Sequence, residues 1–221
     1  MTLPAPADGS VPGYFGVYPA FVTDIVDEKR LGRVEVRFPW MGTEGERDVR
    51  AWATLCSPYA DDEQGLLVLP EVDSQVVVAF EGGNPRRPYV LGAAWNGRAA
   101  LPHEPERANH LRQLRSRQDS RLQFDDTPGA AKVRITMASG HEVTLDDAAR
   151  QITIRHGGGC VIRLTDGTVE IEAGSTLEIT APVVHVTAAH SVFSGTVQVG
   201  TLIVDQGIIS PAYTPGAGNI W

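Results

Sequence analysis

The most constraining feature of this sequence is a series of short apolar pairs in its C-terminal part. In each pair two aliphatic residues flank one residue that is mostly Thr, Glu, Arg or Gln, the alternation typical of a β-strand with one apolar face. Several successive pairs start 7 or 8 residues apart, which indicates stacked strands that cannot bury their apolar faces alone. The pairs are Ile152/Ile154, Ile162/Leu164, Val169/Ile171, Leu177/Ile179, Val184/Val186, Val197/Val199 and Leu202/Val204.

The apolar faces of these strands need a partner surface. A single-chain parallel β-helix uses three strands per coil, so roughly 70 residues of short strands would form barely three coils. Three copies of the chain around one axis would instead bring the Val, Ile and Leu side chains together and leave no long open sheet edge. We therefore expect residues 133–208 to form an intertwined trimeric β-helix, with main-chain hydrogen bonds running between chains.

The N-terminal part predicts a different β-structure. Six strand-like runs separated by turn residues fit a small closed barrel of the OB type at residues 14–97. Gly82, Gly83, Asn84 and Pro85 supply the turn between the last two runs. The runs are Phe15–Val26, Val34–Phe38, Val49–Cys56, Leu66–Leu69, Gln75–Glu81 and Tyr89–Trp95.

The remaining segments complete an all-β chain. Residues 1–13 form a Pro-, Ala- and Gly-rich leader that we expect to be flexible. Residues 98–132 are dense in charge and poor in apolar side chains, which predicts a connector, with a short helical turn at 109–114 as one option. Residues 209–221 form a separate C-terminal segment.

Composition narrows the class of function. The net charge of −8, from 19 Lys and Arg against 27 Asp and Glu, argues against binding a nucleic-acid backbone. Two cysteines, Cys56 and Cys160, cannot build a disulfide framework. The first ten residues have neither a basic nor an apolar signal-peptide region, so we expect no signal peptide.

Motifs that could carry chemistry have simpler interpretations. His156-Gly-Gly-Gly-Cys160 lacks the ending of a phosphate loop and a third catalytic group, so a turn between strands fits better. The paired carboxylates at 61–62, 125–126 and 146–147 are typical of turns. The arginines of 112–121 have no interleaved aromatic residues and predict Arg–Asp ion pairs. We assign no catalytic, cofactor-binding or metal-ligating residue, and we expect the protein not to be an enzyme.

Three stretches carry a resemblance to a known family. Residues 31–40 (LGRVEVRFPW), 76–88 (VVVAFEGGNPRRP) and 121–126 (RLQFDD) resemble the barrel and the barrel-to-needle junction of contractile-tail spikes. These spikes are the phage baseplate assembly protein V group and the VgrG spikes of type VI secretion. The sequence is similar to this family over nearly its whole length.

The resemblance implies a mechanical function and a set of partners. It implies the central spike of a phage tail, tailocin or phage-tail-like secretion particle, whose needle pierces the target envelope and contacts the target membrane transiently. Because only a short leader precedes the barrel, a separate hub protein is implied at the barrel end. A PAAR-type tip protein is implied at the needle end, where we expect Tyr213, Ile220 and Trp221 to form an aromatic docking surface.

Two other classes of protein stay open from the sequence. A single-chain β-helix enzyme acting on carbohydrate needs clustered carboxylates on one face, and an OB-fold nucleic-acid-binding protein needs a basic, aromatic groove. The mass in solution separates them from the spike. Three chains of 23.8 kDa give about 71 kDa, whereas either rival is expected as one chain.

Overall fold

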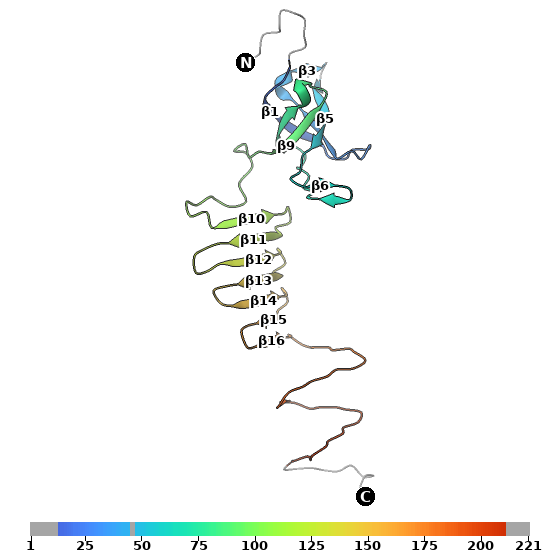
Figure 1. Ribbon diagram of the computed structural model, residues 1–221, viewed down its shortest axis with the longest axis vertical. Helices are drawn as coiled ribbons and strands as arrows, with labels where there is room; N and C mark the ends of the chain where they lie inside the picture. The colour runs from blue at the N-terminus through green and yellow to red at the C-terminus, as the bar shows by residue number, and fades with distance from the viewer. Residues whose placement is uncertain (1–12, 45–46, 211–221) are drawn as a thin grey trace, which may run out of the picture. The chain divides into compact units, whose positions relative to one another are not determined.

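The computed structural model describes residues 13–44 and 47–210, and it divides the chain into a unit that ends at Glu172 and a unit that starts at Ala173. The first unit contains a barrel and a seven-stranded sheet (Figure 1). The barrel strands are β1 (Val17–Asp24), β2 (Arg33–Arg37), β5 (Arg50–Leu55), β8 (Gln75–Phe80) and β9 (Pro88–Ala93). The sheet strands are β10 (Leu111–Arg115), β11 (Arg121–Asp125), β12 (Lys132–Thr136), β13 (Glu142–Asp146), β14 (Gln151–Arg155), β15 (Val161–Leu164) and β16 (Val169–Glu172).

Short elements fill the loops of the barrel. Two 3₁₀ turns follow strands, η1 (Pro39–Met41) after β2 and η2 (Glu81–Gly83) after β8. Two small hairpins are made by β3 (Thr43–Glu44) with β4 (Arg47–Asp48), and by β6 (Ala60–Asp61) with β7 (Gln64–Gly65). The described residues contain no helix that is long and apolar enough to span a membrane.

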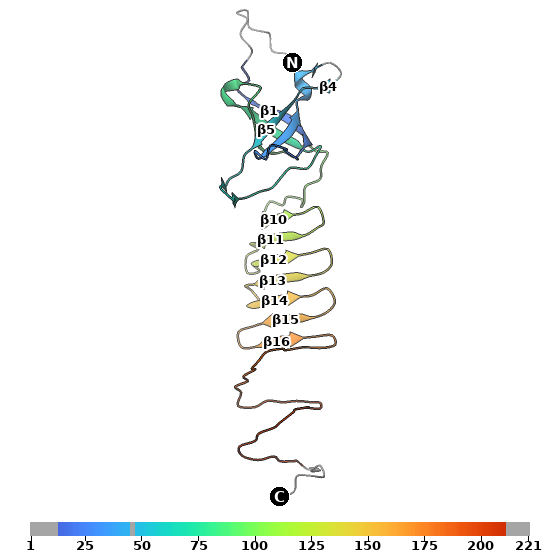
Figure 2. The same cartoon turned by 90° about the vertical axis from the view of Figure 1, so that its right-hand side faces the viewer.

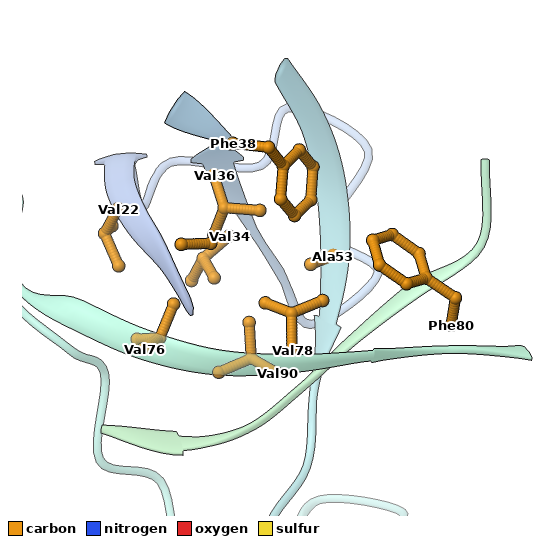
Figure 3. Close-up of a cluster of buried hydrophobic side chains, with 10 residues drawn as sticks. Val22, Val34, Val36, Phe38, Ala53, Val76, Val78, Phe80 and Val90 are labelled. Carbon is orange, nitrogen blue, oxygen red and sulfur yellow. The ribbon is translucent and has the colours of Figure 1, made fainter. Parts of the chain in front are cut away.

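The barrel closes in the order β1-β2-β5-β9-β8, with every pair antiparallel except β5 and β9. Alternation explains its core, because Val34 and Val36 of β2 point inward while their neighbours point outward. Val76 and Val78 of β8 do the same from the opposite wall (Figure 3). These valines are fully buried and form the barrel core. The closed N-terminal barrel and the strands that follow it confirm the expected all-β fold.

Five of the six predicted barrel runs are strands, and one is not. Leu66–Leu69 carries no strand and its side chains are exposed. It follows β7 in the long connection between β5 and β8, where the pairing of β7 with β6 ends at Gly65. A continuous apolar run fits a buried strand equally well from sequence, so this prediction was wrong.

An aromatic cluster packs against the barrel core. The rings of Tyr18 and Trp40 stack with centroids 4.6 Å apart, and Tyr14, Phe38 and Phe80 surround them at 5.4–5.9 Å from at least one of the two. The indole N–H of Trp40 donates to the carbonyl oxygen of Pro19 at 2.8 Å. Trp40 thus packs its ring against the barrel core while its one polar side-chain atom keeps a partner.

The loop between β1 and β2 is fixed by one carboxylate. Asp27 accepts hydrogen bonds from Arg33 Nη2 at 2.8 Å and Nε at 2.9 Å, and from the backbone N–H of Lys29 and Leu31. The hydrogen bond from Arg33 is the main reason that the pKa of Asp27 lies well below its ordinary value of 3.8. A carboxyl with a depressed folded-state pKa stabilises the fold above its ordinary pKa, and this stabilisation is lost as the pH falls below that value.

Replacing Asp27 by asparagine is therefore expected to flatten the acid dependence of barrel stability. The wild type should lose more melting temperature than Asp27→Asn between about pH 5 and pH 3, because only the wild type must protonate this carboxylate. Arg33→Gln removes the largest cause of the low pKa of Asp27 and should flatten the profile in part, because the N–H groups of Lys29 and Leu31 still lower this pKa. Thermal melts between about pH 5 and pH 3 test this prediction. Melting temperatures that fall in parallel with pH for all three proteins would contradict it.

Strands β10 to β16 form a meander in which each strand pairs antiparallel with the next, like successive rungs (Figure 2). Two expectations are corrected here. The segment 98–132 contains β10 and β11, and no helix forms at 109–114. The main-chain hydrogen bonds of residues 111–172 run within the chain rather than between chains, because tight turns reverse the strand direction at each step.

The second unit contains no assigned strand in its described residues, 173–210. The pairs from Leu177/Ile179 to Leu202/Val204 are exposed there. An extended segment without a laterally bonded neighbour is not a strand, and the described part of this unit offers none. The trimeric β-helix over this part of 133–208 therefore stays a proposal.

Candidate trimerisation surface

One face of the seven-stranded sheet is apolar from end to end. The register places the side chains of β11 to β16 in two parallel rows, each with one aliphatic or aromatic residue per strand. Leu114 of β10 extends one row and Arg112 ends the other. The first row is Leu122, Ile135, Val143, Ile154, Ile162 and Ile171, and the second is Phe124, Val133, Leu145, Ile152, Leu164 and Val169.

The described residues of the unit that ends at Glu172 leave this apolar face uncovered. Nine of its residues keep 37–67% of their surface exposed, among them Phe124, Ile154 and Val169. Monomeric proteins rarely expose contiguous apolar patches of this extent, and such patches mark interfaces. The geometry therefore points to association through this face.

The opposite face is largely polar, and ion pairs join its neighbouring strands, while Nε of Arg134 on the same face is buried without a hydrogen-bond partner. Lys132 lies 3.6 Å from Asp146 of the neighbouring strand, and Arg163 pairs with Glu170. The hydrogen bond from the Thr127 hydroxyl is the main cause that lowers the pKa of Asp125, and the backbone N–H of Ala149 does the same for Asp146. Since these groups find partners on their own face, this side can remain in water.

The arginines that precede the apolar rows are also paired, as predicted. Arg115 and Arg121 both contact Asp119, at 2.6 and 2.9 Å, which lowers the pKa of that carboxyl, chiefly through Arg121. Arg112 pairs with Asp126, and Arg117 pairs with Glu71 in the connection between β5 and β8. Arginines engaged with carboxylates are less available to bind phosphate groups.

The His156–Cys160 segment is a tight turn between β14 and β15, which confirms that interpretation. The rings of His141 and His156 lie 4.5 Å apart, and each Nδ1 accepts a backbone N–H, from Gly157 and Gly158 respectively. An Nδ1 lone pair that accepts a backbone N–H is not free to bind a metal ion. Among the described residues, no three His, Cys, Asp or Glu side chains could together hold a metal ion.

The paired carboxylates also serve turns. Asp125 Oδ1 accepts from the backbone N–H of Thr127 at 3.1 Å, and Asp146 Oδ1 accepts from Ala149 at 2.9 Å. Asp61 Oδ1 accepts the N–H of Asp62. Neighbouring carboxylates used in this way do not converge on a common point, so they offer no acid–base pair.

The three residues predicted to dock a tip protein, Tyr213, Ile220 and Trp221, lie outside the described residues. The structure also contains a surface that the sequence did not identify. Residues 57–71, which we call the arm, leave the barrel after β5 and include β6, β7 and the exposed Leu66–Leu69. Their lack of charge from Gln64 to Pro70 was the available signal.

Comparisons with known proteins match both parts of this geometry. The model of the type VI secretion and phage-baseplate injector OB domain matches residues 18–95. The model of the phage baseplate V C-terminal trimerisation domain matches residues 113–178, which include the described strands β11 to β16. The sheet with the uncovered apolar face therefore lies in a region that matches a trimerisation domain, and this match supports a homotrimer in a baseplate-spike context.

Curated relatives agree with the two family matches. The type VI secretion system spike protein VgrG4b of Pseudomonas aeruginosa is 32% identical over 105 residues, which are 45% of this chain and 13% of the relative. VgrG3 of Vibrio cholerae is 21% identical over 132 residues, 57% of this chain and 13% of the relative. The actin cross-linking toxin VgrG1 of Vibrio cholerae is 26% identical over 73 residues, 33% of this chain and 7% of the relative.

The matched region thus corresponds to about an eighth of the length of VgrG4b and of VgrG3. The order of the two matched domains, an injector OB barrel followed by a trimerisation sheet, defines the class as a baseplate spike. The chain belongs to the family of phage-baseplate V and VgrG-like spike proteins.

Proposed function

We propose that this protein is the central spike of a contractile injection machine, and that its needle pierces the target envelope when the sheath contracts. The observation that carries the proposal is the uncovered apolar face of β10–β16, followed in the sequence by further apolar pairs as far as Val204. A trimer that buries these surfaces on its axis has a continuous hydrogen-bond ladder around a dry core. Bending such a body breaks many bonds together, which makes it stiff.

The proposal includes one partner for the barrel and one for the needle. We propose that a separate trimeric hub protein binds the barrel, where Tyr14, Tyr18 and Trp40 form a partly buried aromatic cluster. The needle would contact the target membrane only in passing. Assembly in the bacterial cytoplasm, into a phage baseplate or a phage-tail-like particle, belongs to the same proposal.

The proposal is tested on particles from the bacterium that makes the protein. An antibody against the barrel should label one end of purified contractile particles, and a strain without the gene should make particles that no longer injure target cells. Analytical ultracentrifugation of the pure protein should give about 71 kDa for three chains of 23.8 kDa. Absence of the protein from the particles would refute the proposal.

Deleting residues 213–221 is expected to abolish binding of a PAAR-type tip protein while the trimer persists. The segment contains Tyr213, Ile220 and Trp221, aromatic and aliphatic side chains of the kind that dominate binding energy at interfaces. Pull-down with the PAAR protein encoded nearby measures the binding, and light scattering measures the mass. Retained binding after the deletion would defeat this assignment, and loss of the trimer would show that the segment plugs the needle instead.

A further inference from the structure

The arm at residues 57–71 presents an apolar segment with no partner in the described chain. Leu66, Leu67, Val68 and Leu69 keep 41–78% of their surface exposed, and no charged residue occurs between Gln64 and Pro70. Leu66, Leu67 and Leu69 line an open groove of about 580 Å³, whose other wall includes Ile25 and Leu55 of the barrel. The barrel therefore leaves this segment uncovered.

The arm is nevertheless held in one conformation. The hydroxyl of Ser57 lies 2.9 Å from the carbonyl oxygen of Tyr59 and 2.8 Å from that of Leu66, and the N–H of Leu66 donates to Tyr59 at 2.9 Å. The hydroxyl of Tyr59 donates to Gln64 at 2.7 Å. Gly65, which pairs with Ala60 at the end of β7, has φ of +147°, and a Cβ there would lie 2.7 Å from the Tyr59 carbonyl oxygen, so the β6–β7 hairpin requires glycine at this position. An apolar segment that is ordered before it binds loses little entropy on binding.

The arm is continuous with the trimerisation surface. Glu71 lies two residues after Leu69, and its carboxylate accepts hydrogen bonds from Nε and Nη2 of Arg117. Arg117 lies in the turn between β10 and β11. The same hairpin carries Leu114 and Leu122, which begin one of the apolar rows. Leu114 is 61% exposed, so the arm of the same chain does not cover it.

We propose that Leu66–Leu69 of one protomer packs against a neighbouring protomer and forms a collar above the first layer of the trimerisation sheet. The occupant is a second copy of this chain, because the ion pair joins the arm to a surface that already associates with other copies. A trimer contains this contact three times, so the free energy of burying one modest apolar surface counts three times toward the stability of the trimer. The inference rests on the homotrimer and extends its interface from the sheet into the barrel domain.

Site-specific crosslinking tests the collar in the full chain. A photoreactive phenylalanine replaces Leu67 in a Cys56→Ser/Cys160→Ser background, and the control carries it at Val26, which is 69% exposed on the β1–β2 loop. Irradiation of the purified spike should give covalent dimers and trimers from position 67 and monomers from position 26. Crosslinks from position 67 that stay within one chain, or that form only after a hub protein is added, would overturn the proposal.

A stability measurement separates the collar from the trimer itself. Leu67→Asp should raise the concentration at which the trimer dissociates by about tenfold or more, whereas Leu67→Met and Val26→Asp should leave it near the wild-type value. Unchanged dissociation of a folded Leu67→Asp trimer would refute the collar while leaving the spike function intact. If the wild type itself were a monomer, the proposed function would fail first.

Discussion

Replacing Ile154 by glutamate is expected to convert the trimer into monomers. Ile154 lies in the middle of an apolar row, in register with Val143 on one side and Ile162 on the other. Association would bury three symmetry-related carboxylates in a dry core. Each buried ion costs several kcal/mol after relaxation, and three together are comparable to the roughly 5–15 kcal/mol that stabilises a typical domain. Light scattering should therefore report about 23.8 kDa in place of about 71 kDa.

A control on the same strand separates the apolar face from charge in general. Gln151→Glu adds the same charge to β14 but on the polar face, where it lies opposite Asp146. A like-charge pair directly opposite costs roughly 1 kcal/mol or less, so this variant should remain a trimer. A stable Ile154→Glu trimer with an unchanged melting temperature would mean that the apolar rows are not the interface. Dissociation of Gln151→Glu as well would mean that the effect is not specific to one face.

The barrel could be predicted because its signal is local. Val34 and Val36 alternate with charged residues in β2, and the Gly-Gly-Asn-Pro turn follows β8, so strand positions and inward side chains are set by adjacent residues. Closure then follows from the number of strands and the short connections between most of them. The sequence pattern did not identify the arm as an exposed surface, because apolar and polar residues do not alternate in Leu66–Leu69. An apolar run without polar neighbours does not reveal whether its own chain covers it.

The pairing within the C-terminal sheet could not be predicted in the same way. Alternation identifies the apolar face of a strand, but it is the same whether the strand bonds to its own chain or to another. The turns decide this, and the seven strands from β10 to β16 turn back within a few residues at Gly140 and Gly159, among other places. β10 was missed because Leu111 and Leu114 are three residues apart, so its apolar side chains lie on opposite faces.

Replacing Val186 by aspartate is expected to release residues 173–208 from the needle without dissociating the trimer. In the proposed needle, Val184 and Val186 face the axis and His185 between them faces water. The trimerisation sheet ends at Glu172 in the structure, so its apolar rows remain intact in the variant. Three aspartates on the axis cost several kcal/mol each, enough to prevent this segment from pairing between chains.

Hydrogen exchange of the intact trimer measures this directly. Amides of 173–208 should exchange slowly in the wild type, because inter-chain strand pairing protects them, and at least about a hundredfold faster in Val186→Asp. His185→Asp puts the same charge one residue away, on the outward face, and should keep the wild-type protection. Equal exchange in the two variants would show that alternation does not define the inner face. Fast exchange of these residues in the wild-type trimer would show that the segment is not a β-helix, because a closed ladder of main-chain hydrogen bonds opens only when many of them break together.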